Sequence, residues 1–259
     1  IDADSTNMGI PQALGIDSSP ESLIDYFGGL VFRGGVVTCP ADDPTPLEGA
    51  VLNLKRLNDR YWAKTRSGIV LLVAGKIGRQ GPGEGCDGPL SKIARDIKID
   101  ITEVRPPVSL EDFKAGFEDS ARGVITGLDW AVVIVDPTSA SIQMAINMKK
   151  IVEQIKAGER PATAHLSSSD LIETAHRLYA EAHIKGTLFV FNKIADQESE
   201  TYLREELAKE GIKPLGVIRE DKSISAAWLR GKPLDMRAET ETGQEIIKGI
   251  EAADRTCTH

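Results

Sequence analysis

The sequence has few cysteines, no run of basic residues and no long apolar segment, and each shortage excludes a class of protein. Three cysteines in 259 residues, Cys39, Cys86 and Cys257, are too few for a disulfide framework, which indicates a reducing compartment. The net charge of −8 and the absence of a Lys/Arg stretch argue against a nucleic-acid partner. Apolar runs such as Ile69 to Ala74 are far shorter than the roughly 20 residues of a membrane helix. We therefore expect a cytoplasmic protein without a nucleic-acid or membrane partner.

A phosphate-binding loop is also missing, because no Gly-x-x-x-x-Gly-Lys-[Ser/Thr] motif occurs in these residues. The chain opens on Ile1 without an initiator methionine, and this apolar residue runs directly into Asp2 and Asp4. Such a start resembles the tail of a strand whose body is absent. We expect the sequence to be clipped.

What is present indicates a single α/β domain over residues 1–259. A hydrophobic content of 41% with 27% charged residues is ordinary for a globular protein with a sizeable core. Short apolar runs alternate with segments of helical periodicity, which predicts βαβ units and a parallel sheet. The predicted strands are 1–4, 36–39, 69–74, 108–112, 130–135, 187–191 and 215–218, and the predicted helices are 8–14, 22–27, 89–97, 139–158, 170–184, 196–210, 224–230 and 239–253.

A glycine-rich loop follows the predicted strand Ile69 to Ala74, at the sheet edge where ligands of α/β proteins bind. This loop carries one thiol, Cys86, between the carboxylates of Glu84 and Asp87. Acidic neighbours disfavour a thiolate unless a cation lies nearby, so a metal or a second copy of the loop across a two-fold axis is a candidate partner. The alternative is an exposed glycine loop with an incidental cysteine.

Two acidic positions suit phosphate chemistry. Asp2 and Asp4 project to the same side of a strand end, where a divalent cation such as Mg²⁺ would relieve their repulsion. Asp112 is followed by Gly116, and an aspartate and glycine at this spacing let a loop move when a γ-phosphate is present. A solvated acidic turn and a chance Asp-x-x-x-Gly are the alternatives.

Asn192 and Lys193 come directly after the predicted strand 187–191. The amide of Asn192 offers both a donor and an acceptor to a purine edge, although it could equally form a turn. His165, His176 and His183 have no completing ligand, so solvated or core histidines are favoured over a metal site. Cys39, beside Pro40, is interpreted as structural.

Taken together, these residues resemble the deviant-Walker ATPases, which include the Min and Par ATPases and the nitrogenase iron protein. The greatest similarity is to the accessory ATPases of carbon monoxide dehydrogenase that help to insert nickel. The motifs that carry the resemblance are Asp2-Ala3-Asp4-Ser5-Thr6-Asn7, Val73-Ala74-Gly75-Lys76-Ile77, Gly83-Glu84-Gly85-Cys86, Ala115-Gly116-Phe117-Glu118, Arg122-Gly123, Val133-Ile134-Val135-Asp136-Pro137, Asn192-Lys193 and Leu229-Arg230-Gly231-Lys232-Pro233-Leu234.

The resemblance implies a P-loop NTPase-like fold, a three-layer α/β/α structure with a mostly parallel central sheet that lacks its first β-P-loop-α unit. Three departures from the family pattern stand out. The phosphate loop would precede Ile1. The Cys-x-Cys metal motif keeps only Cys86. Arg219 stands where a proline often contacts adenine.

The function implied is that of an ATP-dependent metallocentre maturation factor for a carbon monoxide dehydrogenase-like client. In such a homodimer Asp4 positions the attacking water, Asp2 and Asp112 lie around Mg²⁺, and Gly116 senses the γ-phosphate of ATP. Asn192 and Lys193 bind the adenine of ATP or ADP. Cys86 of each subunit holds Ni²⁺ or Zn²⁺ at the interface. An ATP-dependent reductase like the iron protein, and a non-hydrolysing interaction module, remain alternatives.

Overall fold

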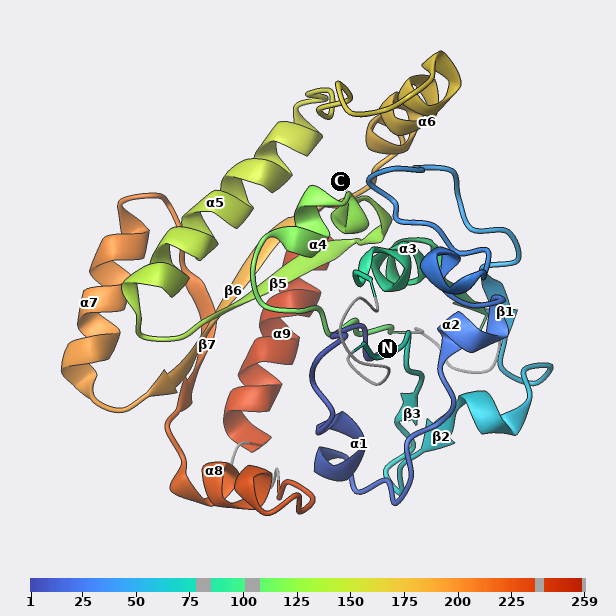
Figure 1. The fold of residues 1–259 in the computed structure, drawn as a ribbon. Coiled ribbons are helices and arrows are strands. Elements are labelled where there is room, and N and C mark those ends of the chain that lie inside the picture. Colours follow the sequence, from blue (N-terminus) through green and yellow to red (C-terminus); the bar gives the residue numbers. More distant parts are fainter. Residues whose placement is uncertain (78–84, 101–107, 236–239, 258–259) are drawn as a thin grey trace. The chain divides into compact units, whose positions relative to one another are not determined.

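The computed structural model describes residues 1–77, 85–100, 108–235 and 240–257 (Figure 1). Helices and strands alternate over most of this length, as the sequence predicts. The helices are α1 (Ile10–Ala13), α2 (Leu23–Tyr26), α3 (Gly88–Asp96), α4 (Glu118–Ala121), α5 (Ser139–Lys156), α6 (Ser169–Ala180), α7 (Gln197–Ala208), α8 (Lys222–Leu229) and α9 (Thr240–Cys257). The strands are β1 (Val51–Asn53), β2 (Ala63–Lys64), β3 (Val70–Leu71), β4 (Lys98–Asp100), β5 (Trp130–Val135), β6 (Gly186–Ile194) and β7 (Pro214–Arg219).

The chain divides into two compact units, which are described one at a time. The first unit contains Ile1–Gly127, Pro161–Glu181 and Gly231–Pro233. The second unit contains Leu128–Arg160, Ala182–Arg230 and Leu234–His259. The prediction of a single domain over the whole chain stays a prediction.

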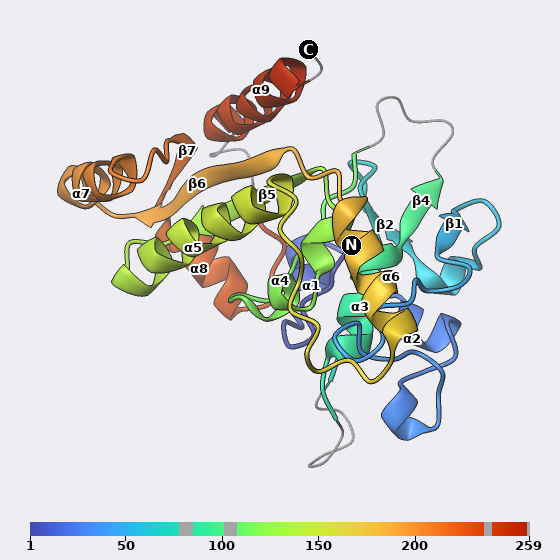
Figure 2. The same ribbon diagram turned by 90° about the horizontal axis from the view of Figure 1, so that it is seen from above.

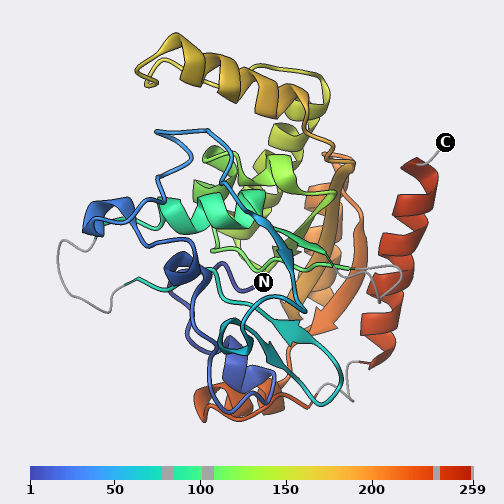
Figure 3. The same cartoon turned by 90° about the vertical axis from the view of Figure 1, so that its right-hand side faces the viewer.

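The second unit is built on a parallel three-stranded sheet in the order β5-β6-β7. The helix α9 lies along one face of this sheet, and α5 lies on the opposite face (Figures 2 and 3). Parallel strands covered on both faces are typical of α/β proteins, because each crossover helix packs back onto the sheet. The parallel sheet predicted from the alternation of strands and helices is therefore confirmed here.

The core of the second unit lies between β6 and the helices α5 and α7. Phe191 and Leu207 are fully buried there, as is Ala145 on the inner face of α5. Burying one large apolar side chain stabilises a fold by about 1.5–3 kcal/mol, so each of these side chains contributes favourably to the unit. Its size explains why the apolar runs in this part of the sequence predict the elements well.

The ends of these helices differ from the sequence prediction in detail. The N-cap of α5 is Thr138 rather than Ser139, because the Thr138 hydroxyl accepts a hydrogen bond from the backbone N–H of Ser141. Likewise Ser168 rather than Asp170 caps α6, which ends at Ala180 instead of continuing to residue 184. Hydroxyl and carboxylate caps compete at neighbouring positions, and only the backbone geometry decides between them.

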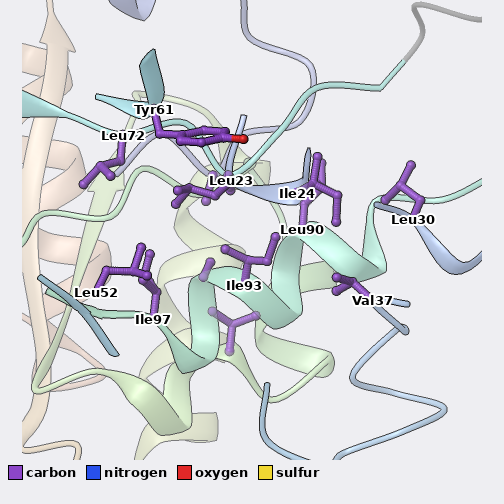
Figure 4. Packing of buried hydrophobic residues seen from close by; sticks show 14 of the residues in the cluster. Leu23, Ile24, Leu30, Val37, Leu52, Tyr61, Leu72, Leu90, Ile93 and Ile97 are labelled. Carbon is purple, nitrogen blue, oxygen red and sulfur yellow. The ribbon is translucent and has the colours of Figure 1, made fainter. Parts of the chain in front are cut away.

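In the first unit, α3 lies at the centre of the larger core. Figure 4 shows Leu90 and Ile93 of this helix among apolar side chains that include Leu23 and Leu52, all of them buried. Gly88 begins α3, and a Cβ atom built there would lie 2.4 Å from Sγ of Cys39, so no side chain fits. The helix predicted from Pro89 in its first turn is confirmed within about one residue.

The strands of the first unit are short, and most predictions for them hold only in part or are wrong. Residues 1–4 form bridges only at Asp2, and β3 keeps Val70–Leu71 of the predicted strand 69–74 and pairs antiparallel with β2 instead of within a parallel sheet. Residues 36–39 form only a single bridge, between Leu30 and Val37, and residues 108–112 form only a bridge at Asp112. A parallel pair of strands, β1 with β4, was not predicted, since a three-residue strand has too few side chains for a recognisable alternation. Pro106 and Pro107 lie outside the described residues.

Candidate functional site

The candidate site begins where three stretches of chain lie side by side in the first unit. Asp2 forms parallel bridges to Val73 on one side and to Asp112 on the other. The backbone N–H of Asp2 donates to the carbonyl of Leu72 at 2.8 Å, and the N–H of Ala3 donates to the carbonyl of Asp112 at 2.9 Å. Residues 1–3 therefore form a central extended segment, and Asp2 and Asp112 meet at one edge as the sequence predicts.

The ammonium of Lys76 donates hydrogen bonds to both carboxylate oxygens of Asp2. Its ammonium lies 2.7 Å from Oδ1 and 2.8 Å from Oδ2 of Asp2, and it also donates to the carbonyl of Asp4 at 2.6 Å. The side chain of Asp2 is 0% exposed and that of Lys76 is 7% exposed. Burial raises the pKa of Asp2, and the ammonium of Lys76 opposes this shift. Lys76 also lines a cavity of about 510 Å³ beside α2.

Asp4 is held as a carboxylate by the turn that follows it. Its Oδ1 accepts from the backbone N–H of Thr6 at 2.9 Å, the hydroxyl of Thr6 at 2.8 Å and the N–H of Asn7 at 3.2 Å. Partial burial alone would raise the pKa of Asp4, but these bonds to the charged form outweigh it and lower the pKa. Asp4 is thus an ionised, oriented carboxylate beside the Asp2–Lys76 pair.

Asp112 stands on the other side of Asp2, next to a special backbone position. Desolvation raises the pKa of Asp112, and the negative charges of Asp2 and Asp4 raise it further. A bound cation would relieve this repulsion. Four residues on, Gly116 has φ = +112°, which residues with a Cβ rarely adopt, while the space around it is open. A side chain at position 116 would therefore be strained by the backbone alone, and movement of this segment stays a prediction.

Asp87, immediately after Cys86, connects this site to the thiol. Its carboxylate accepts from the hydroxyl of Ser5 at 2.8 Å, from Nη1 of Arg122 at 2.7 Å and from the ammonium of Lys114 at 3.4 Å. Burial opposes ionisation, but the Ser5 hydroxyl and the two cations lower the pKa of Asp87. One buried carboxylate thus joins three segments, which are the Asp4 turn, the start of α3 and the stretch after Asp112.

Cys86 itself is exposed, whereas Cys39 is buried, and both thiols are free. Glu84 and the glycines from 78 to 83 lie outside the described residues, so the predicted loop geometry stays a prediction there. Among the residues that the structure describes, no group of three or more His, Cys, Asp or Glu side chains could hold a metal ion. Any metal on Cys86 needs a further ligand.

Asn192 and Lys193 belong to the second unit, and they lie within β6 instead of after it. The strand continues to Ile194, which pairs with Arg219 of β7. The register of this pairing shifts between Phe191 and Ile194, and Lys193 within the shift has φ = +56°. The amide of Asn192 donates to Oδ1 of Asp136 at 2.9 Å, and the ammonium of Lys193 donates to Oδ2 at 2.8 Å.

A cavity of about 610 Å³ lies in the second unit at the N-termini of α5 and α7. Thr138 and Asp196, which cap these two helices, are among the residues that line it. In the described part of the chain, no helix has both the length and the apolar character to span a bilayer.

Lys76 and Arg122 stand in motifs of the family resemblance without a predicted contact of their own, and Asp87 was predicted only as an acidic neighbour of Cys86. The position of Lys76, two residues after a buried strand, was a usable signal, because side chains at strand ends line the ligand edge of an α/β sheet. Asp87 precedes Gly88-Pro89 at the start of α3, which is a typical N-cap position. Only the folded chain brings Arg122 to it.

Comparison with known proteins gives relatives that share sequence over different lengths. No family model matches the chain. An uncharacterized ATP-binding protein of Methanocaldococcus jannaschii is 26% identical over 249 residues, which cover 96% of this chain and 85% of that protein. The carbon monoxide dehydrogenase accessory protein CooC of Rhodospirillum rubrum is 30% identical over 89 residues, which cover 34% of this chain and 33% of CooC.

A solved structure shows which fold the chain adopts. The complex of the cell division proteins MinC and MinD from Aquifex aeolicus contains a chain that matches with a TM-score of 0.50 at 13% identity, covering 100% of this chain and 82% of that one. At this identity the match establishes the fold and nothing about activity. The prediction of an α/β fold of the P-loop NTPase type is confirmed.

Proposed function

We propose that the protein is an ATPase of the MinD and ParA type that uses ATP to assist metal insertion into a client metalloenzyme. The fold and the relationship to an ATP-binding protein support the nucleotide part of this proposal. The partial similarity to CooC and the exposed thiol of Cys86 support the metal part, with nickel as the first candidate. The client would then be a carbon monoxide dehydrogenase-like enzyme.

The residues around Asp2 fit an Mg²⁺-nucleotide site. Asp112 would hold the ion together with nucleotide oxygens, since a bound cation would offset both the desolvation of its carboxylate and the repulsion from Asp2 and Asp4. Mg²⁺ supplies neutralisation of phosphate charge when bound. Asp4, fixed by its turn, would orient the attacking water. Asp2 would act near this ion by fixing the position of Lys76, whose ammonium contacts the carboxylate of Asp2 and the backbone carbonyl of Asp4.

The remaining predicted residues would respond to the nucleotide or bind its base. Gly116 would let the segment after Asp112 move with the γ-phosphate, because its open surroundings and positive φ place no side chain in the way. Asn192 would contact adenine, with Lys193 beside it. The side chains of Asn192 and Lys193 both donate to the carboxylate of Asp136, so an adenine base would have to replace the hydrogen bond from Asn192.

The observation that carries the proposal is the hydrogen bonding of Asp87. This carboxylate contacts Ser5 of the aspartate turn and both Lys114 and Arg122 of the segment after Asp112, and the next residue toward the N-terminus is Cys86. A movement of either segment on nucleotide binding would change the contacts of Asp87. The thiol would therefore respond to the state of the nucleotide site.

A homodimer is part of the proposal, because one Cys86 per chain leaves a metal with too few ligands. Two chains would bring two copies of Cys86 together and form an open site, which is suited to transferring a metal rather than storing it. Ni²⁺ or Zn²⁺ would be the metal carried to the client.

Two measurements on the full-length protein test the proposal. ATP binding and hydrolysis are measured with Asp4→Asn, which should bind Mg²⁺-ATP normally and lose most hydrolysis, and binding of Ni²⁺ and Zn²⁺ is measured with Cys86→Ala. Cys257→Ala serves as the matched thiol control and should bind metal like the unchanged protein. A protein without ATP binding would refute the nucleotide part, and unchanged metal binding by Cys86→Ala would refute the metal part.

A further inference from the structure

We infer that Lys76 is the resident cation of the site around Asp2: its ammonium takes the place of a divalent ion in the free protein and withdraws toward Asp25 when the ion binds. The inference rests on the proposed Mg²⁺-nucleotide site and adds the ion-free state of that site. Asp2 would fix Lys76 until the ion arrives. Binding of Mg²⁺-ATP does not itself require this exchange, so the two proposals can fail separately.

Three oxygen atoms converge on the ammonium of Lys76. Its Nζ lies 2.7 Å from Oδ1 and 2.8 Å from Oδ2 of Asp2, and 2.6 Å from the backbone carbonyl oxygen of Asp4. An ammonium has three donors, and here each has an acceptor. Carboxylate and backbone carbonyl oxygens are also the ligands that hard divalent cations take. The arrangement is therefore that of a cation site whose occupant is a side chain.

One ammonium balances the surrounding acidic groups only in part. Asp112 is joined to Asp2 by a parallel bridge, and Asp4 lies two residues after Asp2, so three carboxyl groups belong to this edge. An ion with two positive charges would balance this group better than an ammonium with one. A divalent cation should therefore be able to displace Lys76 from Asp2.

A cavity beside α2 gives Lys76 space into which it can withdraw. The side chain of Lys76 is 7% exposed while it contacts Asp2, and it lines this cavity of about 510 Å³. A lysine carries its ammonium on a flexible four-carbon stem, so the charge can move while the backbone stays in place. Exchange of the ammonium for an ion thus needs no unfolding of the unit.

Asp25 is the acceptor for the withdrawn ammonium. The backbone N–H of Ile24 donates to the carbonyl of Ala74 at 2.9 Å, so the chain just before Asp25 runs beside the chain just before Lys76. Both Asp25 and Lys76 line the cavity. The carboxylate of Asp25 accepts a hydrogen bond from the hydroxyl of Ser22, and its two oxygens have capacity for a further donor. The cavity therefore offers Lys76 a partner of opposite charge.

The first test follows the reactivity of Lys76 in the full-length protein. Mn²⁺ alone is the probe, because carboxylate and carbonyl ligands suit Mn²⁺ as they suit Mg²⁺. Lysines are acetylated with and without Mn²⁺, and the rate at each position is measured by mass spectrometry. Lys76 should react slowly in the free protein and faster with the ion bound, whereas the exposed Lys64 should react at the same rate in both states. Equal protection of Lys76 with Mn²⁺ bound would overturn the inference.

The second test compares affinities for Mn²⁺, measured from the electron paramagnetic resonance signal of the free ion. Lys76→Met should bind Mn²⁺ at least about tenfold more tightly, because the ion no longer displaces an ammonium. Asp25→Asn should bind it about threefold more weakly, because the withdrawn ammonium loses its acceptor. Asp17→Asn removes an exposed carboxylate outside the cavity and should bind Mn²⁺ like the unchanged protein.

The outcomes distinguish the inference from the proposed function. Equal affinity for Mn²⁺ in the unchanged protein, Lys76→Met and Asp25→Asn would overturn the inference and leave the proposed Mg²⁺-nucleotide site intact. A full-length protein that binds Mn²⁺ neither alone nor with ATP would overturn both. If Lys76→Met does not fold, the labelling of Lys76 and the affinity of Asp25→Asn still decide, since neither measurement uses that variant.

Discussion

Nη1 of Arg122 donates to Oδ1 of Asp87 at 2.7 Å, in a pair whose side chains are 13% and 8% exposed. The two residues are 35 positions apart in sequence, so their contact ties the start of α3 to the end of α4. Removal of one partner from a buried pair leaves the other charge without compensation, which is far more costly than loss of a surface pair.

Asp87→Asn should lower the free energy of unfolding by about 3 kcal/mol, because Arg122 then keeps a buried charge with a weakened acceptor. Chemical denaturation measures this change. Glu118→Gln is the matched control, since Glu118 also contacts Arg122 but its side chain is 55% exposed, and it should cost less than about 0.5 kcal/mol. An equal decrease in the free energy of unfolding in the two variants would show that the contact of Asp87 with Arg122 stabilises the fold no more than the exposed contact of Glu118.

Lys76→Met should destabilise the protein by about 3–5 kcal/mol at neutral pH, because the buried carboxylate of Asp2 loses the ammonium that contacts both of its oxygens. The loss should shrink at acid pH, where an unpaired Asp2 takes up a proton. Asp2→Asn combined with Lys76→Met should recover part of the stability. Lys98→Met, at an exposed position, is the control and should stay within about 0.5 kcal/mol.

Gly116→Ala should cost about 1–3 kcal/mol, since φ = +112° is strained for alanine even though nothing lies within 4 Å of the added Cβ. In the same variant, ATP should change the rate at which Cys86 is alkylated by less than it does in the unchanged protein. Alkylation rates with and without ATP measure this difference. Gly243→Ala offers a comparison in the helix α9, where the space is also open and φ is not positive. That substitution should be neutral or stabilising.

Because of Glu111, the free energy of unfolding should decrease as the pH rises toward neutrality. Burial raises its pKa to about 7, with the N-terminal ammonium opposing the shift, and its Oε2 is buried and has no hydrogen-bond partner in the part of the chain that the structure describes. The folded state therefore keeps a proton that the unfolded chain releases above its ordinary value of 4.5. The contribution is fully present below pH 4.5 and is lost as the pH rises through about 7.

Glu111→Gln should remove this dependence. The difference in unfolding free energy between the two proteins should change by up to about 3 kcal/mol across that window, since one pKa unit corresponds to about 1.4 kcal/mol. Denaturation curves at a series of pH values measure it. Glu48→Gln, at an exposed position, should leave the wild-type slope unchanged, and a Glu111→Gln protein with that same slope would contradict the assignment.

The sequence predicts the second unit better than the first for a physical reason. Strands such as β5 and helices such as α5 have enough residues for an apolar period to stand out, and turn residues separate them. In the first unit, β1 and β4 have three residues each, and their pairing depends on contacts between positions 47 apart. No local pattern contains that information.

The same distinction applies to the candidate site. Asp2 and Asp112 could be placed together from the sequence, because each lies in a predicted strand and parallel strands end at a common edge, although the structure keeps only bridges at these two residues. The pairing of Lys76 with Asp2 and of Arg122 with Asp87 could not, since it depends on side chains brought together from 74 and 35 positions away. The contact of Cys39 with Gly88 likewise joins residues remote in sequence, and the interpretation of Cys39 as structural stays a prediction.

The hydrogen bonds that Asp136 accepts from Asn192 and Lys193 affect which ligands the amide of Asn192 could bind. Any molecule that takes the amide of Asn192 must first compete with a carboxylate that already accepts from both side chains. A weak acceptor would lose this competition, whereas a group that offers the amide both a donor and an acceptor could win it. Asp136 would thus disfavour any ligand that offers the amide of Asn192 only one hydrogen bond.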